Sequence, residues 1–205
     1  MNDKFFELKR EKQDRIINGA LKVFSKSAYK YASTDRIIEE AKISKGLLFH
    51  YFESKEGIYS FLYDYSTRYV ELELYGTLSI KETNYFELLS QIEEAYTKVR
   101  EKYFYMLAFI KQAEMEEEQK IRMVIEKKSV RRKQNYDNIF KNADMRFLDK
   151  FENKDCVKNI ISYCLSGFDK EYENKTEMDL EPWKKEKREY IDLLKILIMK
   201  EEQVI

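Results

Sequence analysis

Apolar side chains recur along most of this chain at intervals of three and four residues, the spacing that places them on one face of a helix. The alternation of apolar and polar positions that marks a half-buried strand is absent. One proline and five glycines are also too few for the many turns of a sheet protein. The pattern therefore predicts an all-α fold of about nine helices.

The periodic segments are bounded by residues that start or interrupt helices. Ser33 and Ser44 are good N-caps, Asn84 and Asp155 are further candidates, and Pro182 suits a first helical position. We therefore expect helices at residues 9–27, 34–41, 45–50, 55–75, 85–102, 103–118, 118–142, 156–172 and from 182 onward.

Residues 33–55 hold two short helices separated by a tight break at residues 42–44. Such a pair is the helix-turn-helix pattern, a three-helix DNA-binding head when a further helix precedes it, and its second helix enters the major groove. We take residues 1–54 as a DNA-binding domain and 55–205 as a second domain. Charge supports this modestly, because residues 1–55 hold 12 Lys and Arg against 8 Asp and Glu. Residues 2–12 form a polar arm that either follows the DNA backbone or lies solvated and frayed.

The string SKGLLFHYFESKE, with a periodic helix of the right length before it, carries a specific resemblance. It is densest at Ile37, Ala41, Ser44, Lys45, Gly46, Leu48, Phe49, His50, Tyr51, Phe52, Ser54, Lys55 and Glu56. In these residues the chain resembles the N-terminal domain of the tetracycline-repressor (TetR) family of bacterial transcriptional regulators. The resemblance ends near residue 65. It implies a helix-turn-helix domain followed by a C-terminal helical bundle for ligand binding and dimerisation.

By resemblance, the second short helix reads DNA. Lys45 is expected to donate to guanine and Leu47 to touch a thymine methyl group, although Leu47 and Phe49 can instead belong to the core. His50, the only histidine, has no catalytic partner nearby and is expected to pack or to contact phosphate. Phosphate contacts are also expected from Thr34, Tyr51 and Lys55. The expected DNA-binding residues are Ser33, Thr34, Lys45, Gly46, Leu47, Phe49, His50, Tyr51 and Lys55.

Two positions depart from the family pattern, which has glycine where this chain has Ala28 and Lys42. Glycines there commonly adopt a left-handed conformation at a helix C-cap. Lys42 in that conformation costs about 1 kcal/mol relative to glycine. Gly46 is retained, and its missing side chain lets backbone or DNA approach closely.

The second domain is rich in aromatic residues, which either fill its core or line a pocket for a small-molecule effector. Lys128 and Arg132 share a helix face with apolar Ile121 and Ile125. There they either extend to the edge of the core or bind an acidic group of a ligand. The expected ligand-binding residues are Tyr65, Tyr69, Tyr96, Tyr103, Phe109, Lys128, Arg132, Tyr136 and Tyr163.

By resemblance, the last two helices form the interface of a homodimer. Gly167 indicates a close helix contact, within the subunit or across the dimer. The helix at 55–75 is expected to carry Tyr65, Tyr69 and Leu72 into the core of the second domain and so to couple ligand to DNA. The expected interface residues are Ile161, Cys164, Leu165, Phe168, Ile191, Leu194 and Ile198.

Other functional classes find little support. The charged start of the chain has no apolar region of a signal peptide, and no apolar run reaches the length of a membrane span, so a cytoplasmic protein is expected. Cys156 and Cys164 are taken as free thiols, and no metal or cofactor is expected. An enzyme is least expected, since no nucleophile–base pair or phosphate loop is evident. We expect a repressor released from a palindromic operator by a small molecule; the alternatives are a regulator with a packed body and no ligand, and a helical interaction protein.

Overall fold

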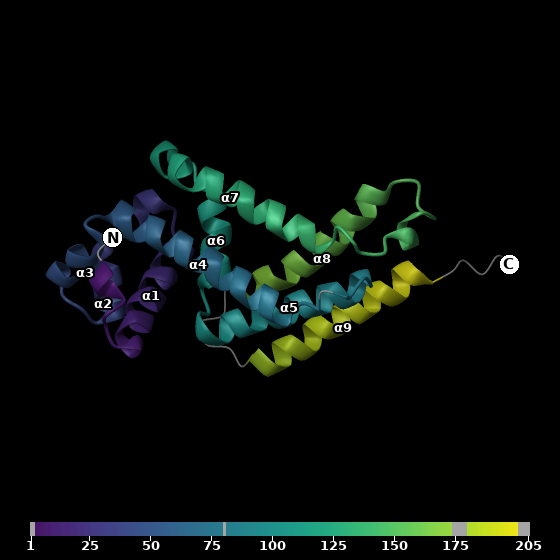
Figure 1. Ribbon diagram of the computed structural model, residues 1–205, viewed down its shortest axis with the longest axis horizontal. Coiled ribbons are helices and arrows are strands. Elements are labelled where there is room, and N and C mark those ends of the chain that lie inside the picture. The colour runs from purple at the N-terminus through teal and green to yellow at the C-terminus, as the bar shows by residue number, and fades with distance from the viewer. Residues whose placement is uncertain (1–2, 80, 174–179, 201–205) are drawn as a thin grey trace. The chain divides into compact units, whose positions relative to one another are not determined.

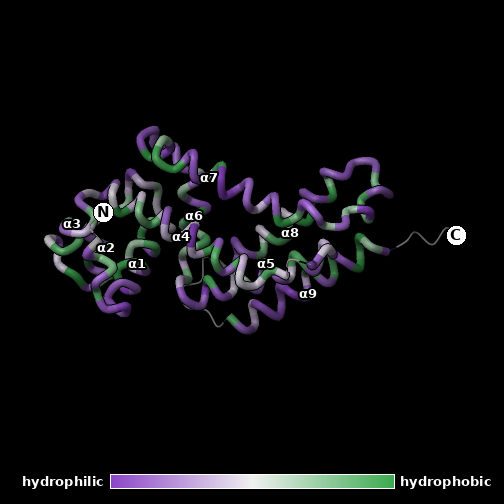
Figure 2. The backbone as a smooth tube through the Cα atoms, viewed as in Figure 1, coloured by the Kyte–Doolittle hydropathy of each residue, from purple (hydrophilic) through white to green (hydrophobic). Residues whose placement is uncertain are grey.

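The computed structural model describes residues 3–79, 81–173 and 180–200, and over those residues it consists of nine α-helices and three short 3-10 helices (Figure 1). The predicted all-α fold is confirmed. Figure 2 shows apolar residues returning at intervals along the helices. In chain order the elements are η1 (Asp3–Phe5), α1 (Arg10–Ser25), η2 (Tyr29–Tyr31), α2 (Thr34–Ala41), α3 (Lys45–Phe52), α4 (Lys55–Thr77), α5 (Tyr85–Lys102), α6 (Met106–Glu114), α7 (Gln119–Ile139), η3 (Arg146–Leu148), α8 (Lys154–Glu173) and α9 (Leu180–Met199).

The chain forms two compact units. The first comprises Met1–Glu73 and Lys98–Asn135, and the second Leu74–Thr97 and Tyr136–Ile205. The predicted DNA-binding helices thus share a unit with most of α4, with α6 and with most of α7. Within the described ranges, no helix is both long enough and apolar enough to span a membrane.

Helix α1 supplies the centre of the first unit. Ile16, Ala20 and Phe24, spaced four residues apart, are buried as the periodicity predicts. Gly19 lies against α2, where an added Cβ atom would come within 2.9 Å of the backbone nitrogen of Ala41. The close approach of α1 and α2 therefore depends on glycine at this position.

The segment before α1 is anchored by an aromatic residue. Phe5 is fully buried, with its ring centroid 5.1 Å from that of Phe52 and 5.2 Å from that of Phe61. Gln13 of α1 holds the turn that follows, because its amide donates to two carbonyl oxygens there at 3.0 and 2.7 Å. The expectation of a solvated, frayed arm is therefore wrong at Phe5.

One of the two expected left-handed positions is confirmed. Lys42 ends α2 with φ 50° and ψ 53°, whereas Ala28 has φ −54° and ψ 150° and is not left-handed. Glu53, the C-cap residue of α3, also has a positive φ, of 66°, and nothing in the sequence indicated it. Beyond it, Gly57 admits no side chain, since a Cβ atom would lie 1.9 Å from the carbonyl oxygen of Phe52.

The C-terminal half of helix α4 buries a different face from the one expected. Leu72 is 70% exposed, so it cannot carry the helix into an apolar core, and that expectation is wrong. Two polar residues obscured the buried stripe in the sequence. The hydroxyl of one of them, Thr67, is satisfied locally by the carbonyl oxygen of Tyr63 at 2.8 Å, so it can be buried. The buried residues of α4 are Ile58, Tyr59, Phe61, Leu62, Tyr63, Ser66, Thr67, Val70 and Leu74.

The N-terminal residues of α5, α8 and α9 agree with the predicted caps in one case of three. Asn84 caps α5 as predicted, its Oδ1 accepting two backbone N–H groups at 3.1 Å. Helix α8 is capped by Asn153, whose Oδ1 accepts a backbone N–H at 3.0 Å, and not by Asp155. Helix α9 begins at Leu180, so Pro182 is its third residue and not its first.

The second unit has its own apolar core and, among its described residues, one buried charge. Lys187 is 1% exposed, and its ammonium lies 2.6 Å from carboxylate oxygens of Asp169 and Glu93. A buried ammonium requires such partners. The core consists of Phe86, Leu89, Leu148, Val157, Ile161, Leu165, Ile191, Leu194 and Ile198.

Candidate nucleic-acid interface

Helices α2 and α3 are each started by a serine hydroxyl. Ser33 Oγ accepts the backbone N–H of Asp35 at 3.2 Å, and Ser44 Oγ accepts that of Leu47 at 3.2 Å. Between them the left-handed Lys42 reverses the chain, with its N–H donating to Glu39 at 3.2 Å. The residues of the predicted helix-turn-helix therefore form that motif, each cap placed as the sequence indicated.

Helix α3 is held by one face and open on the other. Leu48 and Phe52 are each 1% exposed, whereas Lys45, Gly46 and His50 face solvent. A Cβ atom added to Gly46 would meet nothing within 4 Å. The residues expected to face DNA at the start of the helix are therefore accessible, and Leu47 and Phe49 lie half-buried beside them.

Lys45 has a partner that the sequence did not reveal. Its Nζ lies 3.4 Å from Oδ1 of Asp35 on α2, and the two side chains are 66% and 75% exposed. Exposed pairs of this kind contribute little to stability. The pair instead places a carboxylate beside the side chain expected to meet a base edge. No local pattern links residues ten apart on two helices, so the sequence carried no signal for it.

Tyr51 is more buried than a phosphate-contacting residue needs to be. It is 7% exposed, and its ring centroid lies 5.8 Å from that of Phe5 and 5.1 Å from that of His50. Packing in the aromatic core is its evident role, and its contact with phosphate stays a prediction. Ser33 and Thr34 lie half-buried at the start of α2.

Lys55 is held against η2. Its Nζ donates to the carbonyl oxygen of Lys30 at 3.3 Å and sits 4.5 Å from the ring centroid of Tyr29. Burial lowers the pKa of this ammonium, and the nearby carboxylates of Glu116 and Glu118 oppose the shift. One carbonyl takes one of three N–H donors, so the group can still bind a phosphate.

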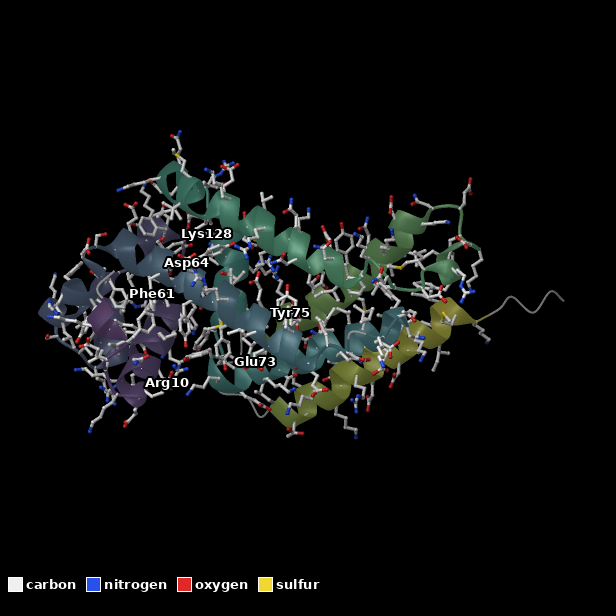
Figure 3. The ribbon with its side chains drawn as sticks, viewed as in Figure 1. Arg10, Phe61, Asp64, Glu73, Tyr75 and Lys128 are labelled. Carbon is white, nitrogen blue, oxygen red and sulfur yellow. The ribbon has the colours of Figure 1, made fainter. Side chains whose placement is uncertain are left out.

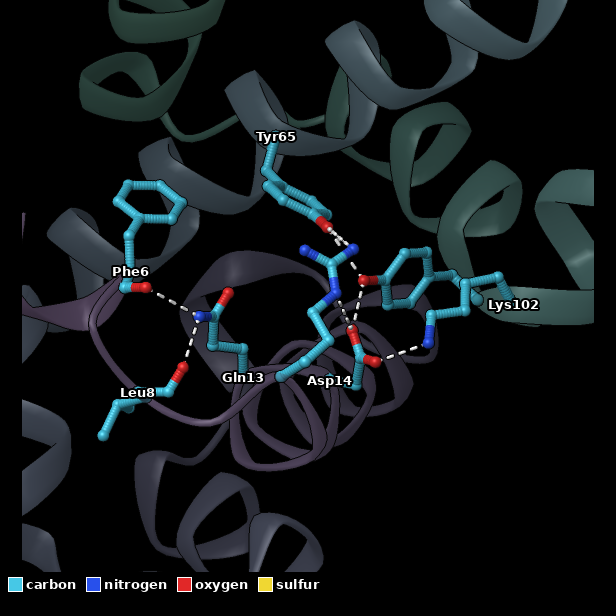
Figure 4. A network of polar contacts seen from close by, with 8 residues as sticks. Phe6, Leu8, Gln13, Asp14, Tyr65 and Lys102 are labelled. Carbon is cyan, nitrogen blue, oxygen red and sulfur yellow. Dashed lines mark hydrogen bonds and ion pairs between the residues drawn. The ribbon is translucent and has the colours of Figure 1, made fainter.

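A polar network ties α1 to other parts of the first unit (Figure 4). Asp14 accepts a hydrogen bond of 2.6 Å from the hydroxyl of Tyr103, which lies 2.8 Å from the hydroxyl of Tyr65. Lys102 also pairs with Asp14, and Arg10 Nε lies 3.4 Å from its Oδ1. Burial alone would raise the pKa of Asp14, but the hydrogen bonds from Lys102 and Tyr103 outweigh it and lower that pKa.

The two cations expected to bind an acidic ligand group already have partners. Lys128 lies 2.7 Å from the carboxylate of Asp64, and Arg132 makes two hydrogen bonds of 2.6 and 2.5 Å to Glu114. Lys128 and Asp64 are labelled in Figure 3. Their charges are neutralised within the first unit. Ligand binding by these two cations stays a prediction, and it would have to compete with the two ion pairs.

The expected ligand-binding aromatic residues do not form one group. Phe109 is fully buried, its ring packed edge-on against Tyr59 at 5.2 Å, so it belongs to the core. Tyr163 on α8 is 71% exposed and lines no interior, so its assignment is wrong. Tyr96 and Tyr136 are half-buried parts of the second unit. Tyr65, Tyr69 and Tyr103 lie together in the first unit, where their rings pack at 5.1 to 6.2 Å.

A cavity of about 360 Å³ lies in the second unit, of the size of a small ligand site. None of the expected ligand-binding residues lines it. Its two cations are engaged, because Arg146 is bonded to Asp144 and Lys150 to the carbonyl oxygen of Lys200. Its lining is Asn84, Tyr85, Phe86, Asp144, Arg146, Phe147, Lys150 and Met199.

The residues expected at the dimer interface face the core of their own subunit. Ile161, Leu165, Phe168, Ile191, Leu194 and Ile198 are at most 9% exposed in the single chain, so they pack within their own subunit, and Cys164 packs against the same core. Helices α8 and α9 each carry apolar residues on two faces, so the periodicity alone does not show which face is buried within the subunit. Gly167 has nothing within 4 Å of its added Cβ, which excludes a close contact with the described residues of its own subunit. The exposed apolar residues of these helices are Ile160, Tyr163, Tyr190, Leu193, Ile196, Leu197 and Met199.

In the described part of the chain, no group of three or more His, Cys, Asp or Glu side chains is arranged to hold a metal ion. Cys156 and Cys164 are free thiols.

Sequence comparison finds a family for the N-terminal region. Residues 16–60 match the tetR family of bacterial regulatory proteins. YuxN of Bacillus subtilis strain 168, an HTH-type transcriptional regulator, is 45% identical over 49 residues. That stretch is 24% of this chain and spans 17% of YuxN.

Structural comparison extends the similarity over the whole fold. A TetR family regulator from Chloroflexus aurantiacus J-10-fl superposes with a TM-score of 0.63 at 17% identity, covering 97% of this chain and 96% of that one. The TetR family regulator PfmR of Thermus thermophilus gives 0.59 at 17% identity, covering 88% and 96%. A TetR-like regulator from Rhodococcus sp. RHA1 gives 0.57 at 20% identity, covering 93% and 96%. At these identities the similarity shows a shared fold.

Proposed function

We propose that this chain, which belongs to the TetR family of bacterial regulatory proteins through residues 16–60, is a sequence-specific DNA-binding transcriptional regulator. It binds a palindromic operator as a homodimer and acts as a repressor that a small molecule releases. Residues 1–54 are the DNA-binding domain in this functional sense, and residues 55–205 serve effector binding and dimerisation.

The observation that carries the proposal is the open face at the start of α3. A recognition helix must pack one face against its own domain and expose the opposite face to enter a major groove. Leu48 and Phe52 pack α3 against the rest of the first unit, and Lys45, Gly46 and His50 are exposed to solvent.

Each residue of the proposed interface has a role that suits its chemistry. Lys45 donates to guanine and Leu47 touches a thymine methyl group. Phe49 lies beside Leu47 as a second apolar contact. The remaining DNA-binding residues meet the phosphate backbone, which positions the helix without reading sequence. They are Ser33, Thr34, His50, Tyr51 and Lys55, whereas Gly46 lets the bases approach the start of α3 closely because it has no side chain.

The homodimer forms through the exposed apolar face of α8 and α9. Leu193, Ile196 and Leu197 are 55%, 61% and 64% exposed and lie on one face of α9. Grouped exposed apolar residues of this kind mark an interaction surface, whereas single scattered ones do not. Gly167, open on its outer side, allows the partner helix to approach closely.

For the effector, Tyr65, Tyr69 and Tyr103 give the best support, because they group aromatic rings with hydroxyl groups. A regulator with a packed body and no effector is the second candidate, favoured by the buried Phe109 and by the paired Arg132. A thermal-shift screen separates the two, since a ligand of the native state raises the unfolding midpoint.

The decisive test of DNA binding is selection from random duplex fragments, followed by titration of the selected sequence. The proposal expects enrichment of an inverted repeat, bound by the wild type. Lys45→Glu abolishes that binding. Lys185→Glu, at an exposed position on α9, retains it and serves as the control for charge reversal. Selection of no sequence would contradict the proposal.

A further inference from the structure

Glu116 is a buried carboxylate that joins two distant segments of the first unit. It is 7% exposed and lies between α6 and α7. Its Oε2 accepts the backbone N–H of Tyr29 at 2.6 Å, across 87 residues of sequence. Its Oε1 accepts the N–H groups of Glu117 and Glu118 at 3.2 and 3.3 Å, so the same side chain orders the approach to α7.

The segment that Glu116 holds is the one that contacts Lys55. The carbonyl oxygen of Lys30 accepts a hydrogen bond of 3.3 Å from Lys55 Nζ, which lies over the ring of Tyr29 at 4.5 Å. The same Tyr29 ring packs edge-on against Tyr59 of α4 at 5.2 Å. The position of the Lys55 ammonium therefore depends on where η2 lies.

A long lysine side chain gains affinity for a phosphate when it is already ordered, because less conformational freedom is lost on binding. For the Lys55 ammonium that order comes from η2, which supplies both the carbonyl oxygen and the aromatic ring. The carboxylates of Glu116 and Glu118 act electrostatically on this ammonium and oppose the lowering of its pKa by burial. Of these two, it is Glu116 that also bonds to the segment holding the lysine.

We propose that Glu116 is a positioning residue for DNA binding: by fixing η2 it sets where the Lys55 ammonium meets the phosphate backbone. The inference rests on the proposed function. It gives the junction of α6 and α7 a connection to the DNA interface that does not run along α4. A change at that junction that withdraws Glu116 from the Tyr29 N–H weakens operator binding.

The test is a double-mutant cycle of Glu116→Ala and Lys55→Ala, measured as operator affinity at several salt concentrations. Glu116→Ala is expected to weaken binding by up to about tenfold per subunit and to reduce the salt slope by about 1, as the loss of one phosphate contact does. The double variant then binds no more weakly than Lys55→Ala alone. Additive losses would overturn the proposal, because a merely structural role for Glu116 does not depend on Lys55.

Two controls isolate the bond to Tyr29. Glu118→Ala removes a charge near Lys55 without touching that bond and is expected to leave affinity unchanged. Glu116→Gln keeps one oxygen for the Tyr29 N–H, so it is expected to recover most of the affinity. If the alanine variant does not fold, Glu116→Gln replaces it in the cycle. The smaller loss of operator affinity that Glu116→Gln causes is then expected to disappear when Lys55 is also replaced by alanine. If the wild type selects no DNA, the proposed function fails; if the wild type selects DNA and Glu116→Ala binds it equally well, this inference alone fails.

Discussion

The hydroxyl of Tyr103 donates a hydrogen bond of 2.6 Å to the carboxylate of Asp14, across 89 residues of sequence. Asp14 belongs to α1 of the predicted DNA-binding domain, and Tyr103 follows α5. The bond therefore ties the DNA-binding helices to the remainder of the first unit through an ionised group. Replacing Asp14 removes the charged acceptor of the Tyr103 hydroxyl, which keeps its contact with Tyr65. It also removes the carboxylate that pairs with Lys102, and the loss of hydrogen bonds to a charged group is costly.

Asp14→Asn tests that bond and its dependence on pH. The variant should lose about 1–3 kcal/mol of unfolding free energy at pH 7. The folded pKa of Asp14 lies below its ordinary value of 3.8, so the stabilisation is present above that value and is lost as the pH falls through the folded pKa. Urea unfolding at pH 7 and at about pH 3 should thus give a smaller difference at the lower pH. Glu11→Gln, exposed on the same helix, is the control, and an equal loss there would refute the assignment.

Tyr59 and Tyr63 form a matched pair for a second prediction. Both are 0% exposed on α4, but the hydroxyl of Tyr63 donates to Glu114 at 2.9 Å, while that of Tyr59 is buried without a partner among the described residues. Tyr59→Phe should stabilise the protein by about 1 kcal/mol, and Tyr63→Phe should destabilise it by a similar amount. Denaturant midpoints of the two variants decide the point, and a loss in Tyr59→Phe would show that its hydroxyl is bonded in solution.

The left-handed Lys42 supplies a third prediction. Lys42→Gly should stabilise the fold by up to about 1 kcal/mol, because glycine adopts positive φ without the clash of a Cβ atom. Lys26 is also a lysine at a helix C-cap, but its φ is −98°. Lys26→Gly should therefore be destabilising or neutral in the same denaturant titration. A gain in both variants would mean that conformation is not the cause.

How far the sequence predicts this structure depends on the range of the interaction. Ser33, Ser44 and Asn84 are readable because a cap bonds to its own helix, three residues away at most. The left-handed turn at Lys42 is expected only from the family's glycine at that position, and the same argument fails at Ala28. Glu116 is not readable, because its partner lies 87 residues away and nothing in either segment marks it.

Errors of face arise where a helix is apolar on two sides. Leu72 and Leu74 both fit a helical stripe, and only the packing shows that the second is buried and the first exposed. The same ambiguity exchanged the two faces of α8 and α9, where Ile161 fills the core and Ile160 faces out. A periodic pattern gives the width of the apolar surface, and tertiary contacts decide which part of it is covered.

The corrected dimer face makes a fourth prediction. Leu197→Glu should dissociate the dimer without unfolding the chain, since Leu197 is 64% exposed in the single subunit. Leu72→Glu is the control, because Leu72 is a similarly exposed leucine outside α8 and α9. Sedimentation equilibrium should report a monomer for the first variant and a dimer for the second. A dimeric Leu197→Glu would place the interface elsewhere.

The central claim is that α3 reads bases while Lys55 holds the backbone. It is tested most directly by titrating the selected operator, and versions of it changed at single positions, with Lys45→Ala and Lys55→Ala at several salt concentrations. Lys45→Ala should cost about 1–3 kcal/mol on the operator and relax preference at one position in each half-site. Lys55→Ala should weaken all sequences alike and reduce the salt slope by about 1 per subunit. If both variants altered the sequence preference in the same way, or if neither altered binding, the claim would be contradicted.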